Sequence, residues 1–244
     1  MSLQSFILDI IKQCNIAKIA VVKVSPHAGK TRVQSYDEDR VLFIDATTHE
    51  PVDEVTGEFG LFNFKILKGL LTMASFQADN ASIKVGTRTV EGVSIPDRID
   101  FKGGGSKATF RLMNKEVVPE QPSIANIPWD ISFKPQAAKI AEFQQMASLY
   151  SDVEGLFALR TDGTDLVVDF GNDSSSTHSA SMVLEEGVSG SLVGEMKFPI
   201  DKFLTLVKVS GDSPEVKLTS KGLLGVTTST EYATYNYYVK KTAS

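Results

Sequence analysis

One stretch of this chain occurs twice, and the repetition restricts the possible fold more than any other feature. The first copy, Gly57–Ala74, reads GEFGLFNFKILKGLLTMA, and the second, Gly194–Ser210, reads GEMKFPIDKFLTLVKVS. Each copy begins with the alternation of a strand and then changes to the i, i+3, i+4 spacing of an amphipathic helix. Without gaps the copies lie 137 positions apart, which sets Lys65 against Lys202. The chain is therefore predicted to contain two copies of a strand–helix unit.

The same offset relates an earlier helix pattern to a later one. The apolar face of a helix predicted near the N-terminus includes Leu3, Phe6 and Ile10, and adding 137 gives Ile140, Phe143 and Ala147. A strand pattern at 20–24 falls on 157–161, which sets Lys23 against Arg160. Matching segments in one order at one offset indicate a tandem duplication.

The duplication predicts an α+β fold with two similar domains. A chain of 244 residues suits two domains of ordinary size. Four prolines punctuate 114–135, where no periodicity is sustained, so we predict domains at 1–113 and 136–244 joined by a connector at 114–135. Each half holds two helices among about eight short strand patterns, and both helices are available to cover one sheet face.

Composition excludes several classes of protein. The apolar content of 42% is that of a globular chain, and no apolar run reaches the roughly 20 residues of a membrane span. The N-terminus lacks the pattern of a signal peptide, and one cysteine, Cys14, cannot form an internal disulfide. We therefore expect a cytoplasmic protein, in the host cell if it is viral, with no membrane partner.

The motifs that resemble catalytic or ligand sites are weak. Ala28–Thr31 ends like a phosphate-binding loop, but the first glycine is missing and a strand pattern follows in place of a helix. The three histidines are isolated, so no metal-ligand spacing is present, and Cys14 lies on an apolar helix face where a thiol is usually a core residue. The acidic clusters fall at predicted turns. We predict no enzyme activity, no cofactor and no metal.

Charge is unevenly distributed along the sequence. The four helix segments and their flanks carry seven lysines against Asp9, Glu142 and Asp201, whereas the whole chain has a formal charge of −5. The helices are thus at +4 and the remainder at −9. Basic helices on an acidic body are expected where the helices face a polyanion. The alternative is that these lysines only solubilise the outer faces of surface helices, and on charge alone it is the simpler interpretation.

The duplicated halves, the connector, the restart KIAEFQQMASL and the ending GLLGVTTSTEYATYNYYVKK together resemble a DNA sliding clamp. The resemblance is closest to the replication clamps of tailed bacteriophages and more distant to proliferating cell nuclear antigen. It implies two clamp domains per subunit and a homotrimeric ring, with helices lining the hole and β-sheets on the outside. It also implies that duplex DNA is contacted without base readout. The DNA-facing residues would be Lys12, Lys65, Lys68, Lys139, Lys202 and Lys208.

The resemblance further implies two protein-binding surfaces. Subunits would join head to tail through Thr109, Phe110, Arg111 and Leu112 of one copy and Met182, Val183, Leu184 and Glu185 of the next, with Arg111 meeting Glu185 or Glu186. A pocket beside the connector would receive peptides from the DNA polymerase and the clamp loader, with Val117, Ile124, Ile127 and Trp129 as candidates. A role for Trp129 in capping the core is an equal alternative.

These features predict a processivity factor that encircles duplex DNA and tethers a replicative polymerase. Two other classes stay open. One is a phage structural or assembly protein built from duplicated β-rich domains, which would form larger rings or tubes. The other is an enzyme whose site has no recognisable motif, and it ranks last because no acid, base, nucleophile or metal cluster converges.

Overall fold

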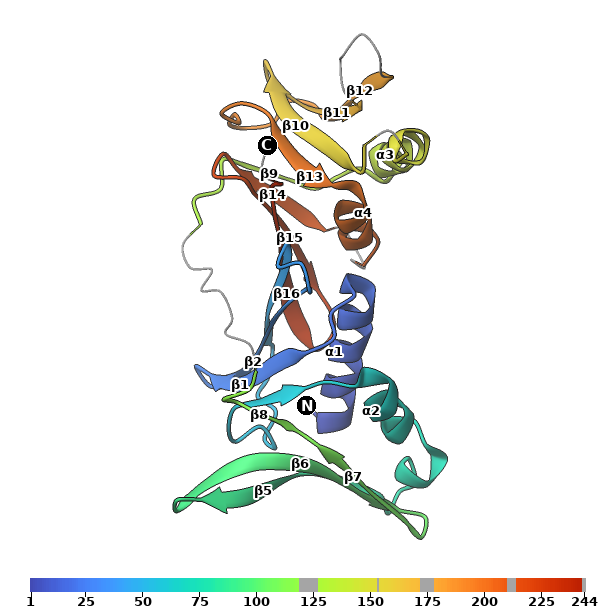
Figure 1. Ribbon diagram of the computed structural model, residues 1–244, viewed down its shortest axis with the longest axis vertical. Coiled ribbons are helices and arrows are strands. Elements are labelled where there is room, and N and C mark those ends of the chain that lie inside the picture. Colours follow the sequence, from blue (N-terminus) through green and yellow to red (C-terminus); the bar gives the residue numbers. More distant parts are fainter. Residues whose placement is uncertain (119–126, 153, 172–177, 210–213, 243–244) are drawn as a thin grey trace. The chain divides into compact units, whose positions relative to one another are not determined.

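The computed structural model of the chain describes residues 1–118, 127–152, 154–171, 178–209 and 214–242, except for the side chains of 208 and 209. It divides the chain into two compact units, and the C-terminal segment contributes to both. The first unit comprises Met1–Arg40, Ile44–Pro122 and Thr230–Tyr235, and the second comprises Val41–Phe43, Ser123–Ser229 and Asn236–Ser244. Each unit combines two α-helices with antiparallel strands, so the predicted α+β class is confirmed (Figure 1). The domain boundaries at residues 113 and 135 stay a prediction.

The first unit contains two helices, a short 3₁₀ helix and two groups of strands. In chain order the elements are α1 (Leu3–Ala17), β1 (Val22–His27), β2 (Lys30–Tyr36), β3 (Leu42–Thr48), β4 (Phe59–Leu61), α2 (Phe64–Leu71), η1 (Ala74–Phe76), β5 (Ser82–Val90), β6 (Val93–Gly103), β7 (Ser106–Arg111) and β8 (Met113–Asn114). Strands β8, β4, β1, β2 and β3 are neighbours in that order, and β5, β6 and β7 form a separate three-stranded sheet.

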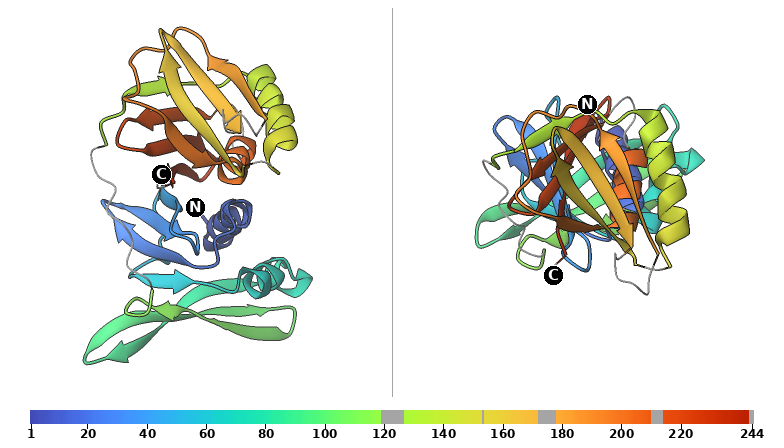
Figure 2. Two further views of the ribbon diagram at one scale, coloured as in Figure 1. Left: turned by 45° about the horizontal axis from the view of Figure 1, so that its top comes forward. Right: turned by 90° about the horizontal axis from the view of Figure 1, so that it is seen from above.

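Helix α1 forms because its N-terminus is capped and its apolar residues recur at helical spacing. The Ser2 hydroxyl accepts a hydrogen bond from the Ser5 amide at 3.1 Å, and Lys18 ends the helix in the left-handed conformation. Phe6, Ile7 and Ile10 are at most 1% exposed. The predicted first helix is therefore confirmed, and it packs against α2 on one side of the strands (Figures 1 and 2).

The second unit repeats this arrangement. Its elements are β9 (Ile131–Phe133), α3 (Ala137–Tyr150), β10 (Leu156–Asp162), β11 (Asp165–Gly171), β12 (Ser179–Glu185), β13 (Met196–Pro199), α4 (Ile200–Val209), β14 (Glu215–Thr219), β15 (Leu223–Ser229) and β16 (Ala233–Lys240). The start of β16, up to Tyr235, belongs to the first unit. Strands β12, β11, β10 and β13 form one sheet in that order, and β16, β15, β14 and β9 are neighbours in another.

A cluster of phenylalanines holds the helices of the second unit on their sheet. The Phe143 ring of α3 lies 5.0 Å from Phe157, 5.1 Å from Phe170 and 4.9 Å from Phe203, measured between ring centroids. These rings come from α3, β10, β11 and α4, and each is at most 1% exposed. Tilted and edge-to-face aromatic pairs stabilise a core by more than their buried area alone predicts. Phe6 and Phe143, which the repeat predicted to be equivalent, are thus both core residues.

Strand pairing corrects one part of the predicted repeat. In the first unit Lys23 lies opposite Gly60, and in the second Ala158 lies opposite Lys197. Gly60 and Lys197 are 137 positions apart, as predicted, so Lys23 corresponds to Ala158 and not to Arg160. The offset is 135 in this strand because the two halves differ in length between the strand and the second helix.

The predicted connector contains more structure than its prolines indicate. Residues 131–133 form strand β9, which pairs antiparallel with β14 through Ile131 opposite Leu218 and Phe133 opposite Val216. Three residues are too few for a periodic pattern to be visible in sequence. The glycine-rich turn predicted after β6 is confirmed, because Gly104 and Gly105 both have positive φ angles, of 52° and 77°.

Candidate functional site

The helices of the first unit expose the three lysines that the sequence singled out. Lys12 of α1 and both Lys65 and Lys68 of α2 are exposed, whereas Phe64, Leu67 and Leu71 of α2 are buried. Ile66, between the lysines in sequence, has a side chain that is 53% exposed. The outer face of α2 is thus basic and partly apolar.

The helices of the second unit present their lysines differently. Lys139 of α3 is partly exposed and donates a hydrogen bond from Nζ to Oε2 of Glu142 at 3.2 Å, which offsets its charge. Lys202 of α4 is partly exposed. Lys208 lies in α4, but its side chain is outside the described residues. The most open basic surface on the described helices is therefore that of Lys12, Lys65 and Lys68.

An acidic residue that the charge count placed on helix α1 does not reach its surface. Asp9 is 8% exposed, and its Oδ2 accepts hydrogen bonds from Tyr235 at 2.7 Å and from Thr230 at 2.9 Å. Burial raises the pKa of Asp9 above its usual value, although the two hydrogen bonds oppose the rise. The surface of α1 is thus more basic than its sequence indicates.

Strand β7, in which the subunit interface was predicted, lies at an edge of its sheet. It pairs with β6 alone among the described strands. Thr109 and Arg111 are exposed, Phe110 is buried, and Leu112, just after the strand, is half-buried. The Arg111 side chain is 68% exposed, and its Nη1 lies 2.5 Å from Asp97, which also contacts Arg88 and Arg98. Arg98 also pairs with Asp100 at 2.9 Å, so three guanidinium groups on β5, β6 and β7 share two carboxylates and leave one excess positive charge on this sheet.

Strand β12, the predicted second half of the interface, is also an edge strand. It pairs with β11 alone among the described strands. Met182 and Leu184 are buried, while Val183 and Glu185 are half-buried. One carboxylate oxygen of Glu185, Oε2, is buried without a hydrogen-bond partner among the described residues. A buried carboxylate oxygen is costly unless a partner is supplied.

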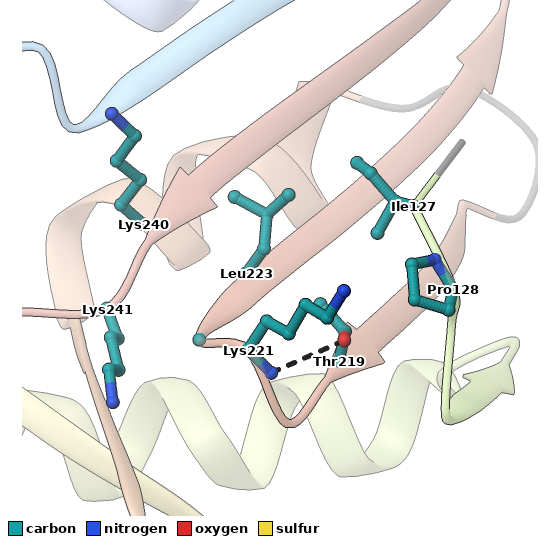
Figure 3. Close-up of a pocket in the computed structure, with 8 residues that line it drawn as sticks. Ile127, Pro128, Thr219, Lys221, Leu223, Lys240 and Lys241 are labelled. Atoms are coloured by element: carbon teal, nitrogen blue, oxygen red, sulfur yellow. Dashed lines mark hydrogen bonds between the residues drawn. The ribbon is translucent and has the colours of Figure 1, made fainter. Parts of the chain in front are cut away.

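A cavity of about 470 Å³ opens beside the end of the connector in the second unit (Figure 3). Ile127 and Pro128 form one wall, and Leu223 of β15 faces them. Around these apolar walls stand three lysines, Lys221, Lys240 and Lys241. Lys241 packs over Gly222, whose φ of 83° and lack of a β-carbon both suit the turn. The cavity can hold apolar side chains beneath a basic rim.

Of the three predicted pocket residues that the structure describes, Ile127 lines this cavity, whereas Val117 and Trp129 do not. Val117 is 68% exposed in the first unit, and Ile124 is outside the described residues. Trp129 stacks on Tyr238 with ring centroids 6.3 Å apart and covers Gly225, where a β-carbon would lie 2.7 Å from the indole. Tyr238 and Gly225 lie on the sheet face opposite buried Tyr237, so Trp129 packs on the outer face and its role stays a prediction.

Sequence reasoning missed the lysines and Leu223 that complete the cavity. Lys240 and Lys241 end the aromatic strand pattern at the C-terminus, and this adjacency was the one visible signal. Lys240 also lies 4.5 Å above the Phe43 ring, a cation–π contact that fixes its stem. The turn before Leu223 reaches the connector only in the folded chain.

The described residues contain no group of three or more acidic, histidine or cysteine side chains placed to hold a metal ion. Cys14 is 2% exposed, and burial raises the pKa of its thiol. The residues that resemble a phosphate loop form the turn between β1 and β2, where Ala28 and Gly29 have positive φ angles. Among the described residues, no helix is both long and apolar enough to cross a membrane.

The arrangement of two α+β units with paired helices is the fold of DNA sliding clamps. Two solved structures match it over nearly the whole chain. One is A. fulgidus PCNA bound to the C-terminal region of FEN-1, with a TM-score of 0.65, 12% identity and coverage of 97% of this chain and 96% of that one. The other is the PCNA2–PCNA3 complex of Sulfolobus tokodaii, with a TM-score of 0.60, 14% identity and coverage of 99% and 97%.

The likeness to PCNA lies in structure and not in sequence. No family model and no curated protein matches the sequence. The predicted sliding-clamp fold is confirmed, and the chain is a distant structural relative of PCNA clamps. At such low identity the fold is shared although few individual residues are, so roles of residues have to be argued from this chain.

Proposed function

We propose that this protein is a processivity clamp: a homotrimeric ring that encircles duplex DNA, tethers a DNA polymerase and has no chemistry of its own. The single observation that carries the proposal is the clamp fold, which extends over nearly the whole of this chain and of the PCNA chains it resembles. Both PCNA structures hold a bound partner, a FEN-1 segment in one and another PCNA chain in the other.

The ring would close through edge strands β7 of one copy and β12 of the next. Both are edges of their sheets and of similar length, six and seven residues. An unpaired strand edge offers a row of free backbone donors and acceptors, so a second edge can extend the sheet. The exposed Arg111 on β7 and the unpartnered oxygen of Glu185 on β12 are complementary in charge, which supports the head-to-tail pairing.

Contact with DNA would come from the helices. Lys12, Lys65 and Lys68 are exposed on adjacent helices of the first unit, and Lys139, Lys202 and Lys208 lie on the helices of the second. Six lysines per subunit, repeated three times, would give a ring a basic inner wall around a polyanion. Contacts to phosphate carry no sequence information, so the ring could slide.

Partner proteins would dock in the cavity lined by Ile127, Pro128 and Leu223. Its apolar walls suit the anchor side chains of a short peptide from a polymerase or a clamp loader, and its volume suits a few such side chains. The adjoining lysines add a preference for acidic residues next to the anchors.

Primer extension by the cognate polymerase on primed circular DNA, with its clamp loader and ATP, tests the proposal. We expect the protein to lengthen the products made in one binding event, and linearising the template should abolish its retention, because a ring slides off a free end. Equal retention on linear and circular DNA, or unchanged product length, would exclude a clamp. Tubes or large rings that ignore DNA would instead support the structural-protein alternative.

A further inference from the structure

The two units differ at one sheet edge. Strand β5 of the first unit and β14 of the second each follow the second helix and open the next hairpin, so they are equivalent. In the second unit β9 pairs with the outer edge of β14. In the first unit β5 pairs only with β6 among the described strands, and its outer edge is open (Figure 1).

Strand β9 shows what such an edge accepts. Ile131 and Phe133 point into the core and are 1% and 8% exposed, whereas Ser132 between them is exposed. They cover Val216 and Leu218 of β14, which are 1% and 0% exposed. An apolar–polar–apolar triplet thus completes the core at this edge.

The equivalent residues of β5 are left partly uncovered. Ile83 and Val85 lie opposite Phe101 and Ile99 of β6, as Val216 and Leu218 lie opposite apolar residues of β15. The β6 residues are 0% exposed, but Ile83 and Val85 themselves are only half-buried. Ile83 and Val85 therefore still face solvent, whereas their equivalents in the second unit are covered by β9.

A cavity lies where the last residue of an added triplet would point. It measures about 230 Å³. Its apolar lining is Leu3, Phe76, Ala78, Ala81 and Ile83, and its polar lining is Ser2, Gln4, Glu54 and Gln77. In the second unit Phe133 lies opposite Val216, the equivalent of Ile83, and precedes the start of α3 by four residues. The cavity therefore corresponds in topology to the place that Phe133 fills.

The charge around β5 identifies the middle residue of the triplet. In the second unit Lys217 forms an ion pair with Glu215 at 2.8 Å, and Ser132 of β9 donates a hydrogen bond to Glu215 at 2.7 Å. At the equivalent positions β5 has Lys84 and Ser82, so the lysine is kept and the carboxylate is absent. Lys84 is exposed, and Asp100, which lies opposite it on β6, forms its ion pair with Arg98. Residues 82–111 carry six basic side chains against three acidic ones.

We propose that the open edge of β5 binds an extended segment of a partner protein, antiparallel, through a triplet of apolar, acidic and apolar residues. The first apolar residue covers Val85, the carboxylate meets Lys84, and the second apolar residue enters the cavity beside Ile83. Backbone pairing supplies affinity and the alternate side chains supply selectivity. The site lies at the sheet edge opposite β7, so it does not depend on the proposed ring.

Synthetic peptides based on this chain's own β9 test the proposal. The probe is the fluorescein-labelled segment 129–135 carrying Ser132→Asp, and its matched control carries Ser132→Lys. Binding is followed by fluorescence anisotropy, and hydrogen exchange locates the bound strand. We expect the aspartate peptide to bind roughly tenfold more tightly than the lysine peptide, because the cross-strand charge pair is reversed. Exchange should slow at Ser82–Val85.

Variants of the full chain separate the contributions. Lys84→Glu should make the lysine peptide bind more tightly than the aspartate peptide. Lys102→Glu, an equal charge change on the central strand, should leave the aspartate peptide the tighter binder. Ala78→Phe, which fills the cavity wall, should weaken both peptides. If Lys84→Glu leaves the order of the two peptide affinities unchanged, the proposal is overturned. The proposal is also overturned if neither peptide binds, or if hydrogen exchange slows only at Glu215–Leu218. Slow exchange in β5 that arises from self-association without peptide would likewise overturn it.

Discussion

Tyr235 donates a hydrogen bond from its phenolic oxygen to Oδ2 of Asp9, 2.7 Å away, and so joins the last strand to the first helix within the first unit. The two residues are 226 positions apart. Thr230 donates a second hydrogen bond to the same oxygen. The contact ties the C-terminal strand into the core of the N-terminal unit, and the raised pKa of Asp9 makes it sensitive to pH.

Asp9→Asn tests that sensitivity. Because the folded pKa of Asp9 is raised above its unfolded value of 3.8, the native state holds the proton more tightly. Ionised Asp9 therefore costs stability at neutral pH, and the cost disappears as pH falls below 3.8. The stability of the wild type relative to Asp9→Asn should decrease as pH rises from acid to neutral, measured by urea unfolding. A pH-independent difference would contradict this. Tyr235→Phe should cost about 1–3 kcal/mol at neutral pH, because it removes a hydrogen bond to a buried carboxylate.

Cys14 should be unreactive in the native protein. Its thiol is 2% exposed, and burial raises its pKa, so little thiolate exists at neutral pH. Iodoacetamide should modify it only after unfolding in urea, as followed by intact mass. Rapid modification of the folded chain would show that α1 opens readily.

The DNA-facing surface is tested by charge reversal. The triple variant Lys12, Lys65 and Lys68 to Glu should lose most of its retention on circular DNA and show a weaker salt dependence, because phosphate contacts are removed. A matched variant with Lys30, Lys102 and Lys115 to Glu makes the same charge change on exposed residues outside the helices and should stay near wild type. Equal losses in both variants would mean that net charge, and not the helix face, governs retention.

The cavity beside the connector is tested through Ile127. Ile127→Ser removes an apolar wall and should weaken binding of the cognate polymerase roughly tenfold, the effect of losing one buried aliphatic contact. Val193→Ser, at a side chain that is 82% exposed and outside the cavity, is the control. If binding by surface plasmon resonance falls equally in both, the cavity is not the docking site.

The predicted interface is tested by exchanging charges across it. Arg111→Glu should place a carboxylate against Glu185 of the next subunit and dissociate the oligomer. The double variant Arg111→Glu, Glu185→Arg should restore assembly, since opposite charges again face each other. If both single variants, Arg111→Glu and Glu185→Arg, remain assembled, the interface lies elsewhere.

The sequence predicted the elements that repeat but not the contacts that depend on folding. The 137-residue offset located both helices of each unit and paired Phe6 with Phe143, because their apolar spacing survives in each copy. It misplaced Lys23, because a length difference between strand and helix is invisible without pairing partners.

The candidate sites were predicted less completely. Lys12, Lys65 and Lys68 are exposed as expected from helical spacing, but the burial of Asp9 depends on Tyr235, far away in sequence. The cavity beside the connector likewise combines Ile127 with Leu223 and Lys241. Such long-range combinations leave no local periodicity for a sequence to display.

The mass of the particle in solution tests the central claim most directly. Three copies of a 26.5 kDa chain give about 80 kDa. Light scattering coupled to size exclusion, at high micromolar concentration, should report that mass for the wild type if β7 and β12 close a three-membered ring. A mass of one or two subunits under the same conditions would contradict the proposed clamp.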